Sequence, residues 1–147
     1  MKLSTKCRYG IRAIVEIARN YQVRPTTRKE IAKKQELNDS YLENILIALK
    51  ASNIVMSTQG PKGGFSLRRA PETITVLQLI EALQGELTLS ECLTTPEVCN
   101  RVDCCVTRNI WLKVKKAQED VLGGITIRDL LAEEDAMNVG FEPTSVS

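Results

Sequence analysis

The chain has 147 residues, of which 43% are hydrophobic and 26% are charged, a composition that excludes intrinsic disorder and predicts about one folded domain. No stretch approaches the roughly 20 consecutive apolar residues of a membrane-spanning helix, which excludes a membrane protein of that kind. The first turns carry charges and lack the apolar centre of a secretory signal, so we expect a cytoplasmic location.

The net charge of +2 hides an uneven distribution of charge along the chain. Residues 1–70 contain 14 Lys and Arg against 5 Asp and Glu, whereas residues 71–147 contain 6 against 13. A basic first half indicates contact with a polyanion such as nucleic acid, and a chance partition of solvated surface charge is the alternative.

Helical patterns dominate the first third of the chain. Apolar residues spaced by three and four positions predict a helix over residues 5–20. Thr27 and Glu30 form a capping box at the start of a second helix. A third helix begins near residues 38–39 and carries an apolar stripe made of Leu42, Ile45, Leu46 and Leu49. A short helix, a tight connection and a second amphipathic helix are typical of the helix-turn-helix.

Two short strands are predicted directly after these helices, at Ile54–Ser57 and Phe65–Arg68. The turn TQGPKGG between them is rich in Gly and Pro, and a hairpin in this place is a wing. A phosphate-binding loop is the alternative, but such a loop opens a helix, whereas this one returns to a strand. With a further helix over residues 75–84, the sequence predicts a winged helix-turn-helix domain over residues 1–84, mainly α with a small β-hairpin.

A long helix is predicted over residues 107–122. Its apolar positions form a narrow seam of the coiled-coil kind, at Ile110, Val114, Ala117 and Val121. We expect this seam to pair with the same helix of a second chain, and packing against its own domain is the alternative. A short helix capped by Thr126 completes a dimerisation unit over residues 107–135, and residues 136–147 are expected to form a disordered tail.

Four of the five cysteines lie in the segment ECLTTPEVCNRVDCCV, within residues 85–106, in a chain without histidine. Disulfides are rare in a reducing cytosol, whereas thiolates are ligands of iron–sulphur clusters and of zinc. The segment therefore indicates a metal centre, and a metal-free thiol switch at Cys104 or Cys105 is the alternative. Without histidine the common general base and nucleophile pairs are absent, so we predict no enzymatic activity.

Three segments carry a resemblance to a known family: MKLSTKCRYGIRAIVEIA, the SYLE of IAKKQELNDSYLENILIALKASNIV, and the GPKGGF of TQGPKGGFSL. Over residues 1–135 the chain resembles the bacterial winged-helix transcriptional regulators typified by IscR, NsrR and CymR. The resemblance implies a homodimer joined through the long helix, with two heads that meet successive major grooves of a palindromic operator in double-stranded DNA.

The resemblance also implies which side chains meet DNA. Ser40, Tyr41 and Glu43 match recognition-helix positions, and the carboxylate of Glu43 can accept a hydrogen bond from a cytosine amino group. Gln59 stands where the family often has an arginine in the minor groove, so the preference for a narrow groove should weaken. Lys62, Arg8, Lys33, Lys34 and Lys50 are expected to contact phosphates, with simple solvation as the alternative for each.

The family's cluster-binding members hold an iron–sulphur cluster in the loop before the long helix. The stretch CVTRNIW aligns Cys105 with the third ligand of that cluster, so the implied ligands are Cys92, Cys99 and Cys105. Arg108 stands where some relatives have a histidine ligand, and a guanidinium cannot coordinate a metal. The resemblance favours a 2Fe–2S cluster, with a 4Fe–4S cluster as the alternative, sensing iron–sulphur status, redox state or nitric oxide.

The fourth ligand is therefore open. Cys7 lies one position from a ligand site of the nitric-oxide-sensing relatives, and we expect it to complete the cluster of a partner chain; simple packing of Cys7 is the alternative. The other candidates are Cys104, Asp103, Glu97 and an exogenous molecule. A zinc-stabilised or metal-free transcriptional repressor of the same fold is the competing function.

Overall fold

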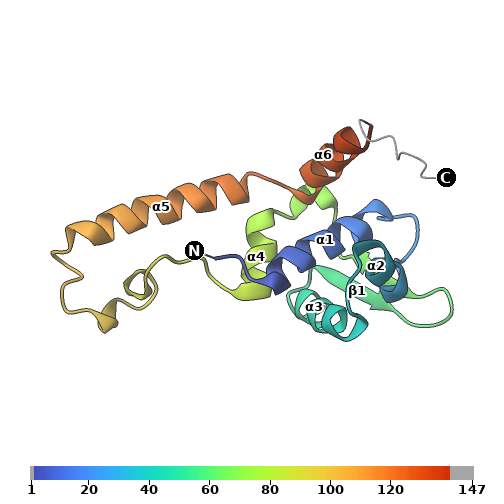
Figure 1. The fold of residues 1–147 in the computed structure, drawn as a ribbon, viewed down its shortest axis with the longest axis horizontal. Coiled ribbons are helices and arrows are strands. Elements are labelled where there is room, and N and C mark those ends of the chain that lie inside the picture. Colours follow the sequence, from blue (N-terminus) through green and yellow to red (C-terminus); the bar gives the residue numbers. More distant parts are fainter. Residues whose placement is uncertain (1, 140–147) are drawn as a thin grey trace, which may run out of the picture.

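The computed structural model describes residues 2–139 and divides into a winged head and a projecting arm (Figure 1). The head contains α1 (Thr5–Arg19), α2 (Arg28–Gln35), α3 (Asp39–Ala51), β1 (Val55–Thr58), β2 (Gly64–Leu67), the 3₁₀ turn η1 (Pro71–Thr73) and α4 (Val76–Gln84). The arm contains the cysteine loop, residues 85–105, with turns η2 (Glu91–Leu93) and η3 (Pro96–Val98), followed by α5 (Val106–Gly123). The last element, α6 (Ile127–Val139), returns to the head.

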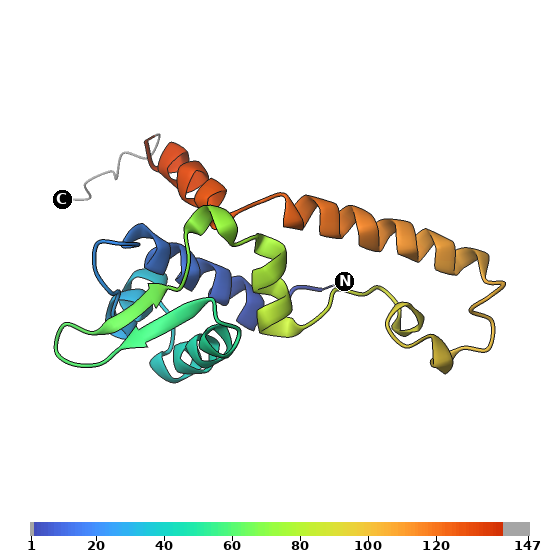
Figure 2. The same cartoon turned by 180° about the vertical axis from the view of Figure 1, so that it is seen from behind.

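The fold class predicted from the sequence is confirmed: the described chain is mainly helical and contains a two-stranded antiparallel hairpin. In both views α5 runs away from the head, and the cysteine loop lies along it toward its far end (Figures 1 and 2). The arm therefore separates the thiols of the loop from the helix-turn-helix surface.

The first helix is the centre of the head, because it packs against α2, α3, α4, α6 and β2. Ser4 caps it by accepting a hydrogen bond from the Cys7 backbone N–H at 3.0 Å. The apolar faces of the surrounding helices close on it, and the largest fully buried side chains of the head include Ile14, Ile17, Ile31, Leu42, Ile45, Leu49 and Leu79. The apolar stripe predicted for α3 is confirmed as its buried face.

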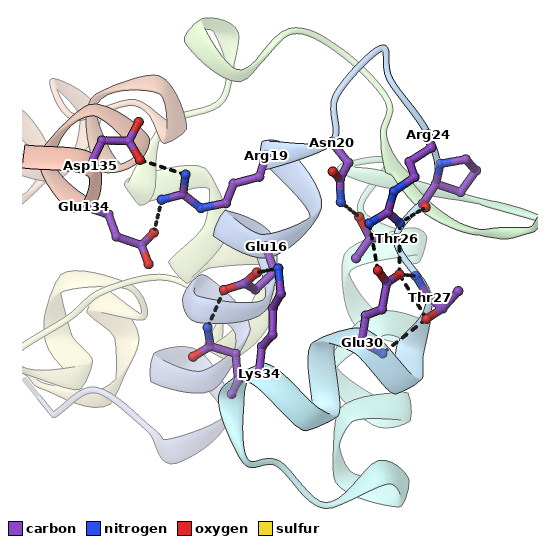
Figure 3. A network of polar contacts seen from close by, with 12 residues as sticks. Glu16, Arg19, Asn20, Arg24, Thr26, Thr27, Glu30, Lys34, Glu134 and Asp135 are labelled. Carbon is purple, nitrogen blue, oxygen red and sulfur yellow. Dashed lines mark hydrogen bonds and ion pairs between the residues drawn. The ribbon is translucent and has the colours of Figure 1, made fainter. Parts of the chain in front are cut away.

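The second helix starts as its sequence predicts. The Glu30 backbone N–H donates to Thr27 Oγ1 at 3.2 Å, and the Thr27 backbone N–H donates to the Glu30 carboxylate at 2.8 Å (Figure 3). Arg24 adds an ion pair to the same carboxylate at 2.8 Å. The Arg24 hydrogen bond and the backbone N–H of Thr27 lower the pKa of Glu30 from 4.5 to about 2.

We expect Glu30→Ala to lower the free energy of unfolding by about 1 kcal/mol at pH 7, because the capping box is lost. The pKa of Glu30 is lower in the folded chain, so its contribution is present above about pH 4.5 and is lost as the pH falls toward 2. Urea unfolding at pH 7 and pH 3 should therefore show a smaller difference between wild type and variant at pH 3. Glu30→Gln, which keeps the cap but not the charge, should retain part of the stability; equal differences at both pH values would contradict this account.

The hairpin pairs Val55 with Leu67 and Thr58 with Gly64, so both strands lie one residue away from the predicted ranges, Ile54–Ser57 and Phe65–Arg68. The difference arises because Gly64 completes the last pair next to the turn, while Arg68 only donates its N–H to Ile54 O at 3.0 Å. Thr26, ahead of α2, exchanges two backbone hydrogen bonds of 2.8 Å with Phe65 and so attaches the wing to the helix-turn-helix.

Two backbone hydrogen bonds attach the segment that follows α5, residues 124–127, to the head. The Val76 N–H donates to Ile125 O at 2.8 Å, and the Ile127 N–H donates to Ile74 O at 2.9 Å. The helix itself has no buried residue in the single chain. Within residues 2–139, no helix combines the length and the apolar character that crossing a membrane would require.

The last helix is capped by Thr126 as predicted, since Thr126 Oγ1 accepts from the Asp129 backbone N–H at 3.2 Å. It continues to Val139, so the prediction that an irregular tail begins at residue 136 is wrong over residues 136–139, and the rest of that tail lies outside the described residues. Ala136 and Met137 are good helix formers, and Arg19 fixes the turn before them through ion pairs of 2.8 Å to both Glu134 and Asp135 (Figure 3).

Candidate functional site

One face of α3 is exposed and polar, whereas the opposite face is buried in the head. The exposed residues recur every three or four positions, as one face of a helix requires: Ser40, Glu43, Asn44, Ile47 and Lys50. Tyr41 is half-buried, and its ring packs edge-on against Tyr9 with centroids 6.0 Å apart. Ser40 and Glu43 are therefore free to meet a partner, while Tyr41 also fixes the start of α3 against α1.

The carboxylates on this face are held by an arginine of the preceding helix. Arg28 Nε lies 2.9 Å from Asp39 Oδ1, and Arg28 Nη1 lies 3.5 Å from Glu43 Oε1. The guanidinium offsets two negative charges that would otherwise repel phosphates and orients the Glu43 carboxylate. The sequence alone does not single out Arg28, because its contacts join two helices and no short-range pattern reports them.

The wing is joined to α3 by a hydrogen bond of 2.8 Å from Lys50 Nζ to Ser57 Oγ. A shallow groove of about 190 Å³ lies between them and is lined by Arg28, Glu43, Leu46, Ile47, Lys50, Ser57, Gln59 and Phe65. Gln59 and Lys62 are exposed on the wing. The structure thus brings Glu43, Lys50 and Gln59 to one continuous surface, and Lys62 extends that surface along the hairpin turn.

The turn of the wing depends on Gly63. A Cβ atom added there would lie 2.0 Å from the backbone oxygen of Thr58, a distance that forces the turn to open. We expect Gly63→Ala to weaken DNA binding by about tenfold, because at least one wing–DNA contact worth about 1.4 kcal/mol would be misplaced. The buried core of the head should stay folded. Fluorescence anisotropy with operator DNA and circular dichroism measure the two effects. Gly60→Ala, where an added Cβ meets nothing within 4 Å but φ is +101°, strains the same turn without a steric clash and separates the two causes.

The remaining basic candidates lie away from this groove. Arg8 is exposed at the start of α1 and donates to Thr5 Oγ1 at 3.4 Å. Lys33 is exposed on α2, whereas the ammonium of Lys34 pairs with the buried carboxylate of Glu16 at 3.2 Å (Figure 3). Lys34 thus has a structural role between α1 and α2, which makes a phosphate contact by this residue a weaker prediction than one by Lys33.

The predicted seam of α5 is exposed in the single chain. Ile110, Val114 and Val121 expose 51%, 37% and 61% of their surface, and Ala117 is exposed with them. Trp111 and Leu112 add further apolar surface that the seam pattern did not include. A helix face with this many exposed apolar side chains, uncovered by residues 2–139, is the expected form of an interface between subunits.

The loop thiols do not gather at one point. Within residues 2–139, no group of three Cys, Asp or Glu side chains has the arrangement of a metal site. Cys92 Sγ lies 3.3 Å from Ser90 Oγ, and Cys105 Sγ lies 3.1 Å from Thr107 Oγ1. Cys99 is half-buried and Cys104 is exposed. The donor chemistry fits an iron–sulphur cluster, and cluster binding would require the loop to close around it.

Cys105 is the residue before the first turn of α5. The hydroxyl of Thr107 and the backbone N–H groups of Arg108 and Thr107 hydrogen-bond to its sulphur, which lowers the pKa of the Cys105 thiol. The thiolate is the form of cysteine that binds metal and reacts with oxidants, so the lowered pKa favours both metal binding and oxidation at Cys105. Arg108, at the position where the resemblance places a histidine in some relatives, has its Nε buried without a hydrogen-bond partner among residues 2–139.

Cys7 lies in the core of the head and is 0% exposed. Burial raises the pKa of its thiol, which disfavours the thiolate. A packing role for Cys7 needs no rearrangement, whereas ligation of a partner's cluster would require the side chain to leave the core. The role of Cys7 as fourth ligand stays a prediction, and the structure favours the packing alternative.

The loop is attached to the middle of α5. Lys115, whose side chain is 17% exposed, pairs with Glu86 at the start of the loop and with Glu119 of its own helix at 3.4 Å. With Cys105 at the other end of the loop, both ends are fixed to the same helix. A rearrangement of the cysteine loop would therefore be transmitted first to α5.

Comparison with known proteins identifies the family. The pattern of the Rrf2 family, described as "Iron-dependent Transcriptional regulator", matches residues 3–133. The chain belongs to the Rrf2 family. It is a bacterial-type transcriptional regulator and not an enzyme, because its Rrf2-family relatives are regulators. The family resemblance inferred from the sequence is thereby confirmed.

Two kinds of Rrf2 relative are similar to this chain. The HTH-type transcriptional regulator CymR of Bacillus subtilis is 33% identical over 135 residues, which cover 92% of this chain and 93% of the relative. The structure of that protein, described as the global cysteine regulator, superposes with a TM-score of 0.77 and covers 90% of this chain and 98% of that one. The structure of T. potens IscR has 34% identity and a TM-score of 0.75, covering 97% and 93%.

Proposed function

We propose that this Rrf2-family chain binds a palindromic operator as a homodimer and that its cysteine loop senses the state of an iron–sulphur cluster. The observation that carries the DNA-binding part is the continuous exposed surface of α3 and the wing, with Glu43 oriented by Arg28 and Lys50 joined to Ser57. Two such surfaces, one per head, would meet successive major grooves.

The geometry of the arm supports a route from loop to operator. The loop is held to α5 at Glu86 and at Cys105, and the segment directly after α5 is held to the head by the backbone hydrogen bonds of Val76 and Ile127. If α5 pairs with α5 of a partner, its orientation determines the distance between the two heads. A coupling of about 1–3 kcal/mol would change operator affinity by about 5–150-fold.

Cys92, Cys99 and Cys105 would hold the cluster, whose iron would supply sensitivity to oxidation, nitric oxide or iron supply. The chain's own part is to provide a thiolate at Cys105, to keep the loop against α5 through Lys115, and to pass the rearrangement to the head. Neither Cys7 nor Arg108 is required in this proposal.

A metal-free thiol switch is the second candidate. It is supported by the lowered pKa of Cys105, by the exposure of Cys104 beside it, and by the absence of a gathered ligand group within residues 2–139. Zinc bound by the same thiolates is a third arrangement with the same ligand chemistry. Anaerobically purified protein separates them, because a cluster protein is brown and both alternatives are colourless.

The DNA-binding part is tested by selection from random-sequence duplexes at a fixed moderate salt concentration. The homodimer should enrich one palindromic sequence with half-sites about one or two helical turns apart. Enrichment of no sequence over competitor DNA would contradict operator binding, because salt-dependent contact with phosphates alone would then account for any retention.

A further inference from the structure

We infer that Ile47 is a base-reading residue that contacts the C5-methyl group of a thymine in each operator half-site. This inference rests on the proposed operator binding and adds a specific chemical contact to it. A thymine methyl is the one apolar group that a base pair presents in the major groove, and apolar side chains recognise it.

The position of Ile47 on α3 carries the inference. The side chain is 59% exposed, although isoleucine is among the residue types most often buried. It lies one turn beyond Glu43 and one turn before Lys50, in the middle of the exposed face of the helix. It also lines the groove between α3 and the wing together with Lys50, Ser57 and Gln59.

The surroundings distinguish Ile47 from other exposed apolar side chains. In the described part of the head, Val23 and Met56 are also large and exposed, but they line a separate groove with Tyr21, Pro25 and Leu67. The predicted dimer seam lies on α5, which projects away from the head (Figures 1 and 2). The other apolar side chains of the α3–wing groove, Leu46 and Phe65, are buried and half-buried. Ile47 is therefore the large exposed apolar side chain of that groove, beside side chains that suit base edges and phosphates.

The chemistry of the neighbours favours DNA over a protein as the occupant of this surface. Lys50 has ammonium protons left after its bond to Ser57, and Arg28 offsets the charge of Asp39 and Glu43. A hydrophobic protein partner would be expected to meet a wider exposed apolar patch than the one large exposed apolar side chain of this groove. A single methyl contact beside hydrogen-bonding groups matches the edge of a base pair.

The test uses the selected operator and copies of it in which one symmetric pair of thymines at a time is replaced by uracil, which lacks the methyl group. We expect one pair of positions at which uracil weakens binding of the wild-type homodimer by about fourfold per half-site. Ile47→Ala should bind the thymine operator as weakly as wild type binds that uracil operator, and should be insensitive to the replacement there.

Two further variants separate base reading from a general effect. Ile47→Val keeps a branched apolar side chain and should retain most of the uracil sensitivity. Val23→Ala removes an exposed apolar side chain outside the α3–wing surface and should behave as wild type. Unchanged thermal unfolding of Ile47→Ala is expected, because the side chain is not part of the core.

The inference is overturned if uracil has no position-specific effect on the wild type, or if Ile47→Ala keeps the same uracil sensitivity as the wild type. Either result would leave operator binding intact, since the selected operator is still bound. Failure of the selection itself would instead overturn the proposed function, and the inference with it.

Discussion

Replacing Val114 with glutamate is expected to convert the proposed homodimer into a monomer and to weaken operator binding by roughly 100-fold or more, because two linked half-site contacts become one. Val114 lies in the middle of the seam on α5 and is 37% exposed in the single chain. In a paired helix, two such carboxylates would face each other away from water, which costs several kcal/mol. The head should stay folded, because no residue of α5 belongs to its core.

Sedimentation velocity and operator binding measure this effect, and circular dichroism checks the fold. Lys116→Glu is the matched control, because Lys116 lies on another side of the same helix in an exposed pair with Asp120. We expect that variant to remain a dimer despite its larger change in charge. A dimeric Val114→Glu protein with wild-type affinity would show that the chains do not pair through this seam.

Replacing Cys105 with serine is expected to have the largest effect on the sensor. Iron and sulphide after anaerobic reconstitution should fall to background, because serine provides no thiolate at the start of α5. The 5–150-fold difference in operator affinity between loaded and unloaded protein should disappear with them, leaving one affinity of about the unloaded value. Metal and sulphide analysis measures the iron and sulphide content, visible absorbance measures the amount of cluster, and operator binding measures the difference in affinity.

Cys104→Ser is the matched control, because Cys104 is exposed and adjacent in the chain. It should retain both the absorbance and the difference in affinity. If Cys104→Ser loses the cluster and Cys105→Ser keeps it, the alignment that assigns the third ligand is off by one position. If neither change alters the metal content while thiol oxidants still change DNA binding, the metal-free switch replaces the cluster.

Cys7→Ala addresses the fourth ligand. Since Cys7 is completely buried, we expect a small loss of stability, of about 1 kcal/mol, and an unchanged visible spectrum after reconstitution. Chemical denaturation and absorbance measure the two quantities. Loss of the spectrum in a variant that remains folded and dimeric would restore Cys7 as the ligand supplied across the interface.

The helices of the head could be predicted because their signals are local. Asn38 and Thr126 are N-caps, and Thr27 is the N-cap of a capping box that Glu30 completes. The apolar stripe from Leu42 to Leu49 has the period of a helix. The strands were predicted within one residue, because the turn is marked by glycine while the final pairing is set by Gly64. The end of α6 could not be predicted, because its ion pairs come from Arg19, more than a hundred residues earlier in the chain.

The residues of the candidate site also fall into two groups: those that sequence patterns predict and those that only the packed structure reveals. Ser40, Glu43 and Gln59 follow from their places in a known pattern, and the structure brings the last two to one groove. Arg28 and Ile47 are visible only when the helices are packed, since an arginine at a helix start and an isoleucine in a helix have ordinary roles in a sequence. In the proposed function, the arrangement of the cysteines would depend on a bound cluster and on a second chain, and neither is encoded in local spacing.

The most direct test of the central claim is the affinity of the protein for the operator obtained by selection, measured at fixed salt before and after removal of metal from anaerobically purified protein. The account predicts that the purified protein contains iron and sulphide and that the two affinities differ by about 5–150-fold. Equal affinities, or a protein without iron and sulphide, would contradict the claim that a cluster in the cysteine loop controls DNA binding.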